Sequence, residues 1–211
     1  MLASPDQRGR SESLSRHNLI LVRHSLPIFQ SEIPASQWRL SEEGFRRAAL
    51  LPQHLSPYHP TRIISSPETK AQQTAQIIAS SLHLTWFIED GLHEHERPQA
   101  AGNTSQAQFE NLVADFFAHP NQLVFGSESA DQAYMRFSSA IDQLITSYPQ
   151  ETLVIVSHGT VISLFISHKC GLEAFELWRR LGLPFIIVLS LPGFQLQHIT
   201  ESIQSLHEPR H

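Results

Sequence analysis

Two histidines stand directly after apolar, strand-like runs of the chain. The run NLILV is followed by Arg23 and His24, and the run TLVIVS is followed by His158. An imidazole can act as a nucleophile or carry a proton near neutral pH, and a guanidinium binds anions. The carboxyl ends of parallel strands share one edge of a sheet, where open α/β folds bind their ligands. The sequence therefore predicts one site for all three side chains, although the two histidines lie far apart along the chain.

A third junction, SSPETK, adds a lysine to this edge. Ser66 has the side chain of a helix N-cap, Pro67 suits the first helical position, and Glu68 suits the first turn. Lys70 falls in the same turn, where the helix dipole disfavours a cation, so we expect an anion to bind between Lys70 and the helix amides. Replacing Lys70 with methionine should then leave the fold intact. The helix predicted after Gly159 offers further amides, and these groups together indicate a pocket for a phosphate group.

The elements that must position these groups alternate between two periodicities. Strand-like runs occur in NLILV (18–22), TRIISS (61–66), LTWFIE (84–89), ETLVIVSHG (151–159), PFIIVLS (184–190) and FQLQHIT (194–200). Helical patterns occupy 40–55, 67–82, 132–148 and 160–170. This alternation predicts a three-layer α/β sandwich, with a mostly parallel central sheet and helices on both faces. The last two runs are separated by a short turn, so we expect a hairpin and one antiparallel edge strand.

Composition limits the function classes. The chain has 211 residues, of which 41% are hydrophobic, and we divide it into a flexible tail at 1–16 and a single globular domain at 17–211. A net charge of -5 argues against nucleic-acid binding. The lone Cys170 allows no intramolecular disulfide, and no apolar leader or membrane-length run is present, so we expect a cytoplasmic protein without membrane contacts. Nothing in the sequence bears on its oligomeric state.

Four motifs in this order resemble the histidine phosphatase superfamily, also called phosphoglycerate mutase-like. LVRHS resembles the family's strand ending in Arg-His-Gly, and SSPETKAQQTA resembles S-S-x-x-x-R-A-x-x-T-A. LHEHER matches L-x-E, and VIVSHGTVI matches the strand ending in S-H-G. The resemblance implies a phosphomonoester hydrolase that needs no cofactor or metal and acts on a small phosphorylated substrate or a phosphoprotein.

The same resemblance implies a role for each matching residue. His24 would be the nucleophile and Glu94 the proton donor, with His158 serving both catalysis and phosphate binding. The phosphate would also be held by Arg23, Lys70 and the amide of Gly159.

Two residues depart from the family pattern. Ser25 stands in place of the usual glycine, so the backbone after the nucleophile cannot rely on glycine's freedom at positive φ. Lys70 stands where most members have arginine, which replaces a bidentate planar fork with a point charge. A binding module that has lost turnover is therefore one alternative. A mutase is another, although family mutases have a longer insert than the segment between Glu94 and His158.

Several assignments stay open at the level of sequence. Glu96 lies two residues beyond Glu94 and is an alternative proton donor, and the flanking His93 and His95 are alternative metal ligands. The segment FGSES resembles a G-E-S segment of the family, but a Gly-Ser turn explains it equally well. The sequence has neither C-x-x-x-x-x-R nor D-x-D, so nucleophilic cysteine and aspartate phosphatases are excluded. The natural substrate is open among sugar phosphates, phosphoglycerates, nucleotide-pathway intermediates and phosphoproteins.

Overall fold

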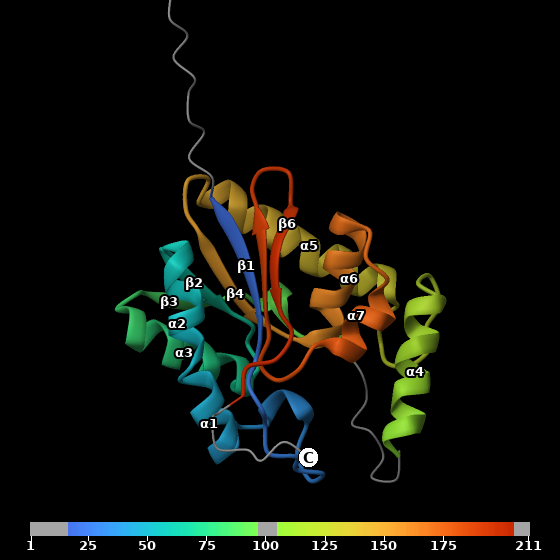
Figure 1. The fold of residues 1–211 in the computed structure, drawn as a ribbon. Helices are drawn as coiled ribbons and strands as arrows, with labels where there is room; N and C mark the ends of the chain where they lie inside the picture. The colour runs from blue at the N-terminus through green and yellow to red at the C-terminus, as the bar shows by residue number, and fades with distance from the viewer. Residues whose placement is uncertain (1–16, 97–104, 205–211) are drawn as a thin grey trace, which may run out of the picture.

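A six-stranded sheet forms the centre of the molecule (Figure 1). The computed structural model describes residues 17–96 and 105–204, so the tail predicted at 1–16 lies outside the described residues. The strands are β1 (Asn18–Arg23), β2 (Arg62–Ser65), β3 (Trp86–Ile88), β4 (Leu153–Ser157), β5 (Ile186–Ser190) and β6 (Gln195–Thr200). Their order is β3-β2-β4-β1-β5-β6, and β1 to β4 are parallel. The predicted α/β fold is confirmed; the antiparallel strand is β5, one position in from the edge strand β6.

Helices cover both faces of this sheet (Figure 1). On one face lie α1 (Glu42–Ala48), α2 (Leu51–Leu55) and α3 (Thr69–Leu82). On the other lie α5 (Ala130–Ser147) and α6 (Gly159–Cys170), followed outward by α7 (Ala174–Arg180) and α4 (Gln106–Ala118). Among the residues described, no helix is long and apolar enough to span a membrane.

Strand β1 shows how its sequence fits this three-layer arrangement. Leu19 and Leu21 belong to the apolar core under α5 and α6, whereas Ile20 and Val22 belong to the core under α2 and α3. Successive side chains of a strand point to opposite faces, so a strand that is covered on both sides needs apolar residues at every position. This explains the continuous apolar run that precedes the arginine and the histidine.

The structure corrects two predicted helix boundaries. The helical pattern at 40–55 forms two helices, because Pro52 near the start of α2 has no N–H to continue the hydrogen bonds of α1. Helix α3 begins at Thr69 with Glu68 as its N-cap, so the prediction of Ser66 as N-cap is wrong. Ser66 instead extends the sheet, since its amide donates to the carbonyl of Val156 at 2.9 Å. Helices α4 and α7 were not predicted from the sequence pattern.

The segment between β1 and α1 returns on itself close to the end of β1. Pro27 and Leu40 form an isolated antiparallel bridge, and the amide of Ile28 donates to the carbonyl of Arg39 at 2.8 Å. The hydroxyl of Ser41, which caps α1, also donates to the carbonyl of Leu26 at 3.0 Å. Residues 28–39, which we call the 28–39 loop, are thus closed at their base by backbone contacts.

Candidate active site

The ends of three parallel strands place their following residues at one edge of the sheet. Arg23 is aligned with Ser157 across the pair of β1 and β4, and the amide of His24 donates to the carbonyl of Ser157 at 2.9 Å. The rings of His24 and His158 lie edge to face with centroids 5.1 Å apart. The structure therefore brings together the two histidines and the arginine, as the parallel strand order requires.

His24 is held in one tautomer by the backbone. Its Nδ1 lies 2.7 Å from the carbonyl oxygen of Ser25, and because a carbonyl only accepts, Nδ1 carries the proton. Burial, followed by the nearby His158, Lys70 and Arg23, lowers the pKa of His24 well below its ordinary value of 6.5. The ring is therefore neutral at pH 7, with its lone pair on Nε2, which is the form that a nucleophile needs.

Ser25 adopts an ordinary backbone conformation. Ser25 does not have a positive φ, so serine in place of the family's glycine causes no backbone strain at this position. Its amide donates to the hydroxyl of Thr74 in α3 at 3.1 Å, and this hydroxyl donates in turn to the carbonyl of Lys70 at 2.8 Å. The backbone that holds His24 is thereby joined to the first turns of α3.

Arg23 lies against the start of α6. Its Nη1 donates to the carbonyls of Leu181 at 2.8 Å and Gly182 at 3.4 Å, in the loop that leads into β5. These bonds hold the guanidinium in place. A Cβ at Gly159 would stand 3.0 Å from Cζ of Arg23, closer than carbon atoms normally approach. A side chain at position 159 would therefore push the guanidinium a few tenths of an ångström away from the first amides of the helix.

His158 is the N-cap residue of α6 and is fully buried. Its Nε2 lies 2.7 Å from the hydroxyl of Ser66 and 3.5 Å from Oε1 of Glu68. Ser66 is therefore not a helix cap but a partner of the second histidine. These contacts join the ends of β2 and β4 beside His24, whose ring contacts that of His158.

Only one of the two candidate proton donors lies at this edge. The carboxylate of Glu94 accepts hydrogen bonds from the amides of Thr160 at 3.2 Å and Val161 at 3.3 Å, in the first turn of α6. Glu96 is exposed, and its carboxylate accepts from the hydroxyl of Ser127 at 2.8 Å, which lowers its pKa. The geometry favours Glu94 over Glu96 as the carboxyl group of the site.

The two neighbouring histidines point to other partners. His93 Nδ1 lies 2.6 Å from the carbonyl of Asp90, and its Nε2 lies 3.2 Å from Glu96. His95 is buried against Phe116, and its Nε2 lies 3.1 Å from the carbonyl of Glu128. Within the part of the chain that the structure describes, no group of three or more His, Cys, Asp or Glu side chains is arranged to hold a metal ion.

Glu68 is a member of the site that sequence analysis treated only as a helix residue. It is 8% exposed, and its Oε2 forms an ion pair with Nζ of Lys70, which also donates to the carbonyl of Ala35 at 2.7 Å. Its Oε1 accepts from the amide of Glu94 at 2.9 Å. Burial raises the pKa of Glu68, but the Lys70 ammonium and the hydrogen bonds outweigh this effect, so the pKa lies below its ordinary value. The sequence predicted an anion beside Lys70, and the structure provides one within the chain, the carboxylate of Glu68.

A second pair that sequence analysis missed holds the segment containing Glu94. The guanidinium of Arg136 in α5 donates to the carbonyls of Gly91 at 2.8 Å, His93 at 2.9 Å and Glu94 at 3.3 Å. It also pairs with the carboxylate of Glu128 at 2.6 Å. The one sequence signal for this arrangement was the segment FGSES: its glutamate accepts the Arg136 guanidinium, so the segment is more than a Gly-Ser turn.

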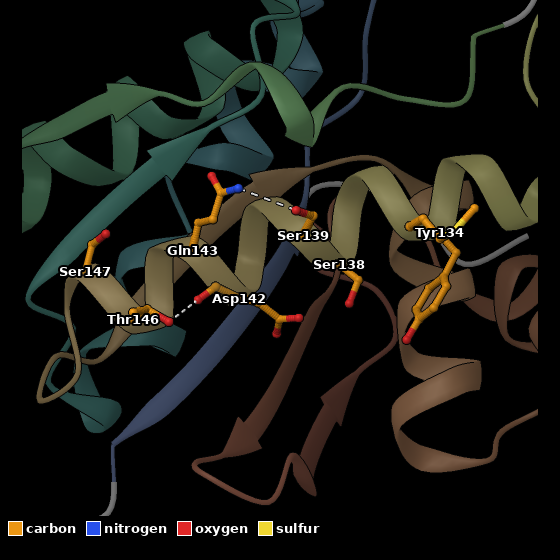
Figure 2. A pocket seen from close by; sticks show the side chains of 8 residues that line it. Tyr134, Ser138, Ser139, Asp142, Gln143, Thr146 and Ser147 are labelled. Atoms are coloured by element: carbon orange, nitrogen blue, oxygen red, sulfur yellow. Dashed lines mark hydrogen bonds between the residues drawn. The ribbon is translucent and has the colours of Figure 1, made fainter.

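A surface groove of about 630 Å³ lies elsewhere, along one side of α5. Figure 2 shows its side chains, among them Tyr134, Asp142 and Gln143, projecting from this single helix. None of the residues that line it is a predicted site residue, and none follows the carboxyl end of a strand. The groove is therefore separate from the candidate active site.

A buried neutral imidazole flanked by cations, at the carboxyl edge of the parallel strands of an α/β protein, is an arrangement suited to phosphoryl transfer. Comparison with known families agrees: residues 19–189 match the histidine phosphatase superfamily (branch 1). The chain belongs to this superfamily, which confirms the family predicted from its motifs.

Curated relatives include a phosphatase and probable mutases. The chain is 29% identical over 171 residues to phosphoserine phosphatase 1 of Hydrogenobacter thermophilus, covering 76% of this chain and 79% of the relative. It is 29% identical over 179 residues to a probable phosphoglycerate mutase of Yersinia pestis, covering 77% of this chain and 79% of the relative.

Solved structures show the same fold. A mycobacterial glucosyl-3-phosphoglycerate phosphatase superposes with a TM-score of 0.67 at 19% identity, covering 90% of this chain and 98% of that one. A phosphoserine phosphatase mutant from Entamoeba histolytica superposes with a TM-score of 0.65 at 20% identity, covering 90% and 98%.

Proposed function

We propose that this protein hydrolyses phosphomonoesters through a phosphohistidine formed on Nε2 of His24. The single observation that carries the proposal is the tautomer of His24, whose Nδ1–H is held by the Ser25 carbonyl while a lowered pKa keeps the ring neutral. Membership of the histidine phosphatase superfamily and a curated phosphoserine phosphatase among the relatives support a phosphatase.

The first half-reaction transfers the phosphoryl group to the protein. Nε2 of His24 attacks phosphorus, the N–P bond forms, and the bond from phosphorus to the ester oxygen breaks. Arg23, Lys70 and His158 stabilise the charge on the equatorial oxygens, together with the amide of Gly159 at the start of α6. The departing alkoxide is a strong base, so it leaves with a proton from Glu94.

Glu94 must gain that proton when the substrate enters. In the free protein, three backbone amides, from His95, Thr160 and Val161, donate to its carboxylate and favour the ionised form. A phosphoryl dianion beside this carboxylate favours the protonated form instead, because like charges repel. In the second half-reaction, ionised Glu94 takes a proton from water, the water oxygen attacks phosphorus, and inorganic phosphate leaves as His24 is restored.

Phosphoglycerate mutase activity is the second candidate, because a probable mutase is among the relatives. A mutase shares the first half-reaction but returns the phosphoryl group to another hydroxyl. We favour hydrolysis, because the segment between Glu94 and His158 is shorter than the insert expected of a mutase. The unstrained backbone at Ser25 supports an active enzyme over a binding module that has lost turnover.

The test is to trap the covalent intermediate. Rapid quenching during turnover of a labelled substrate should yield a phosphorylated protein that is stable in alkali and loses its label in acid, and His24→Ala should abolish both label and turnover. An acid-stable adduct, or full turnover by His24→Ala, would refute the assignment.

The role of Glu94 has its own test. Glu94→Gln should slow an alkyl phosphate far more than p-nitrophenyl phosphate, whose leaving group needs little protonation. Glu96→Gln is the matched control and should slow both substrates little. The reverse pattern would move the proton donor to Glu96.

We further propose that the substrate is a small phosphorylated metabolite or a phosphoprotein, that no metal takes part, and that the protein acts in the cytoplasm without binding nucleic acid. Activity should then persist in EDTA, and loss that zinc or magnesium restores would contradict metal independence. A screen of phosphorylated metabolites, including phosphoserine, would identify the substrate.

A further inference from the structure

Glu68 places a carboxylate among the groups proposed to bind phosphate. It forms an ion pair with Lys70, lies 3.5 Å from Nε2 of His158, and accepts from the amide of Glu94. Both members of the ion pair are buried, with side-chain exposures of 6% for Lys70 and 9% for Glu68. A negative charge at this depth is unexpected in a pocket whose ligand is an anion.

The lowered pKa of Glu68 means that this carboxylate is ionised at neutral pH. Its charge therefore offsets that of Lys70, while the remaining hydrogen-bonding capacity of the ammonium is kept: one donor goes to Glu68, one to the carbonyl of Ala35, and an ammonium has three. The pair thus leaves one donor of the ammonium for a ligand without adding net positive charge to the pocket.

We propose that Glu68 weakens the binding of inorganic phosphate at the active site and thereby speeds product release. The inference rests on the proposed function, since phosphate is the product only if the protein is a phosphatase. Three oxygens of inorganic phosphate correspond to the equatorial oxygens of the transition state, so the same groups of the pocket bind both. If nothing offset the charge of Lys70, the pocket would bind the product phosphate tightly and release it slowly. Glu68 acts on phosphate through charge and through Lys70, and it forms no bond to the reacting atoms.

The expected size of the effect follows from Coulomb's law. A phosphate oxygen that accepts from Nζ of Lys70 would lie about 4.6 Å from the Glu68 oxygen, given charge-assisted hydrogen bonds of about 2.8 Å and the tetrahedral angle between two donors of one ammonium. At an effective dielectric constant of about 20, a unit charge at this distance changes affinity by more than tenfold.

The experiment compares Glu68→Gln with the wild type. Phosphate is titrated into each protein by calorimetry, and its inhibition constant is measured against p-nitrophenyl phosphate. We expect Glu68→Gln to bind phosphate about tenfold more tightly or better, with KM and kcat both lowered because product leaves slowly. An unchanged or weaker phosphate affinity would overturn the proposal.

Glu151→Gln is the matched control. Glu151 pairs with Arg62 at the start of β2, and therefore at the opposite edge of the sheet, so the same loss of one paired carboxylate occurs far from the site. Its phosphate affinity should equal that of the wild type. Glu68→Asp keeps the charge and should also keep the phosphate affinity close to the wild-type value, which separates charge from side-chain shape.

A second comparison covers the case in which Glu68→Gln does not fold. The double variant Glu68→Gln/Lys70→Met removes both charges of the pair, and we expect it to bind phosphate about tenfold more tightly than Lys70→Met alone. Equal affinities of these two variants would overturn the proposal. If the wild type neither binds phosphate nor forms a phosphohistidine, the proposed function fails as well; if it does both and only the Glu68 comparisons fail, the proposed function stands.

Discussion

Replacing Arg136 should separate the position of the proton donor from the stability of the fold. Its guanidinium holds three carbonyls of the segment that contains Glu94 and pairs with Glu128. Arg136→Met removes all of these bonds and leaves the Glu128 carboxylate without its cation. Breaking a fully buried ion pair costs about 3–5 kcal/mol. The side chains of this pair are 19% and 11% exposed, so we expect a loss of about 2–3 kcal/mol in the free energy of unfolding.

The kinetic signature distinguishes positioning from simple destabilisation. If the segment moves, Glu94 loses its alignment with the leaving oxygen, and hydrolysis of an alkyl phosphate should fall by about 10- to 100-fold, a part of what general acid catalysis supplies. Hydrolysis of p-nitrophenyl phosphate by the same folded protein should fall much less. Arg136→Lys should give an intermediate result, because lysine can pair with Glu128 but lacks the planar fork.

The assays are urea denaturation and the ratio of the two hydrolysis rates below the unfolding transition. Arg62→Met is the matched control, since it breaks an Arg–Glu pair, also partly exposed, at the opposite edge of the sheet. It should lower stability without changing the rate ratio. An unchanged ratio in folded Arg136→Met would refute the idea that Arg136 positions Glu94.

Three other substitutions test the electrostatics and packing of the site. The pKa of His24 in the folded protein lies well below about 6.5, so the unfolded chain takes up a proton at this residue first. The free energy of unfolding should therefore fall as the pH drops below about 6.5. In urea titrations at several pH values, His24→Asn should reduce this slope by up to about 1.4 kcal/mol per pH unit. Lys70→Met should destabilise the protein by about 3–5 kcal/mol in thermal or urea unfolding, because it leaves the buried Glu68 carboxylate unpaired; unchanged stability would contradict the ion pair. Gly159→Ala should keep the fold but weaken phosphate binding several-fold, because the Cβ of the alanine would displace the guanidinium of Arg23. Calorimetry measures this affinity, and a phosphate affinity equal to that of the wild type would place Arg23 outside the pocket.

The sheet was predictable because its determinants are local. Continuous apolar runs of the length of strands, alternating with helical patterns, specify a covered parallel sheet, and the carboxyl ends of its strands then gather Arg23, His24 and His158 without any knowledge of side-chain contacts. The helix boundaries failed where a side chain had a tertiary partner. Ser66 resembles an N-cap in sequence but contacts His158, which belongs to a distant part of the chain.

The partners of the site were not predictable for the same reason. The helix dipole alone indicates that Lys70→Met leaves the fold intact, but the ion pair with buried Glu68 reverses the expected effect. Arg136 occupies an ordinary position in an amphipathic helix, and its contacts with Gly91 and His93 join segments that are remote in sequence. Charge pairing between such segments leaves no periodic trace in the sequence.

The closed base of the 28–39 loop separates the side chains of the loop from the backbone that holds His24. The bridge between Pro27 and Leu40 and the backbone bond from Ile28 to Arg39 fix the distance across the loop, so changes in its length or composition need not be transmitted to His24. The loop meets Lys70 through the carbonyl of Ala35, a contact that any residue at that position can make with its backbone. Its exposed side chains, such as Phe29, are therefore free to diverge while the chemistry stays constant. A substitution in this loop can therefore change the surface beside Lys70 while the backbone that holds His24 keeps its place.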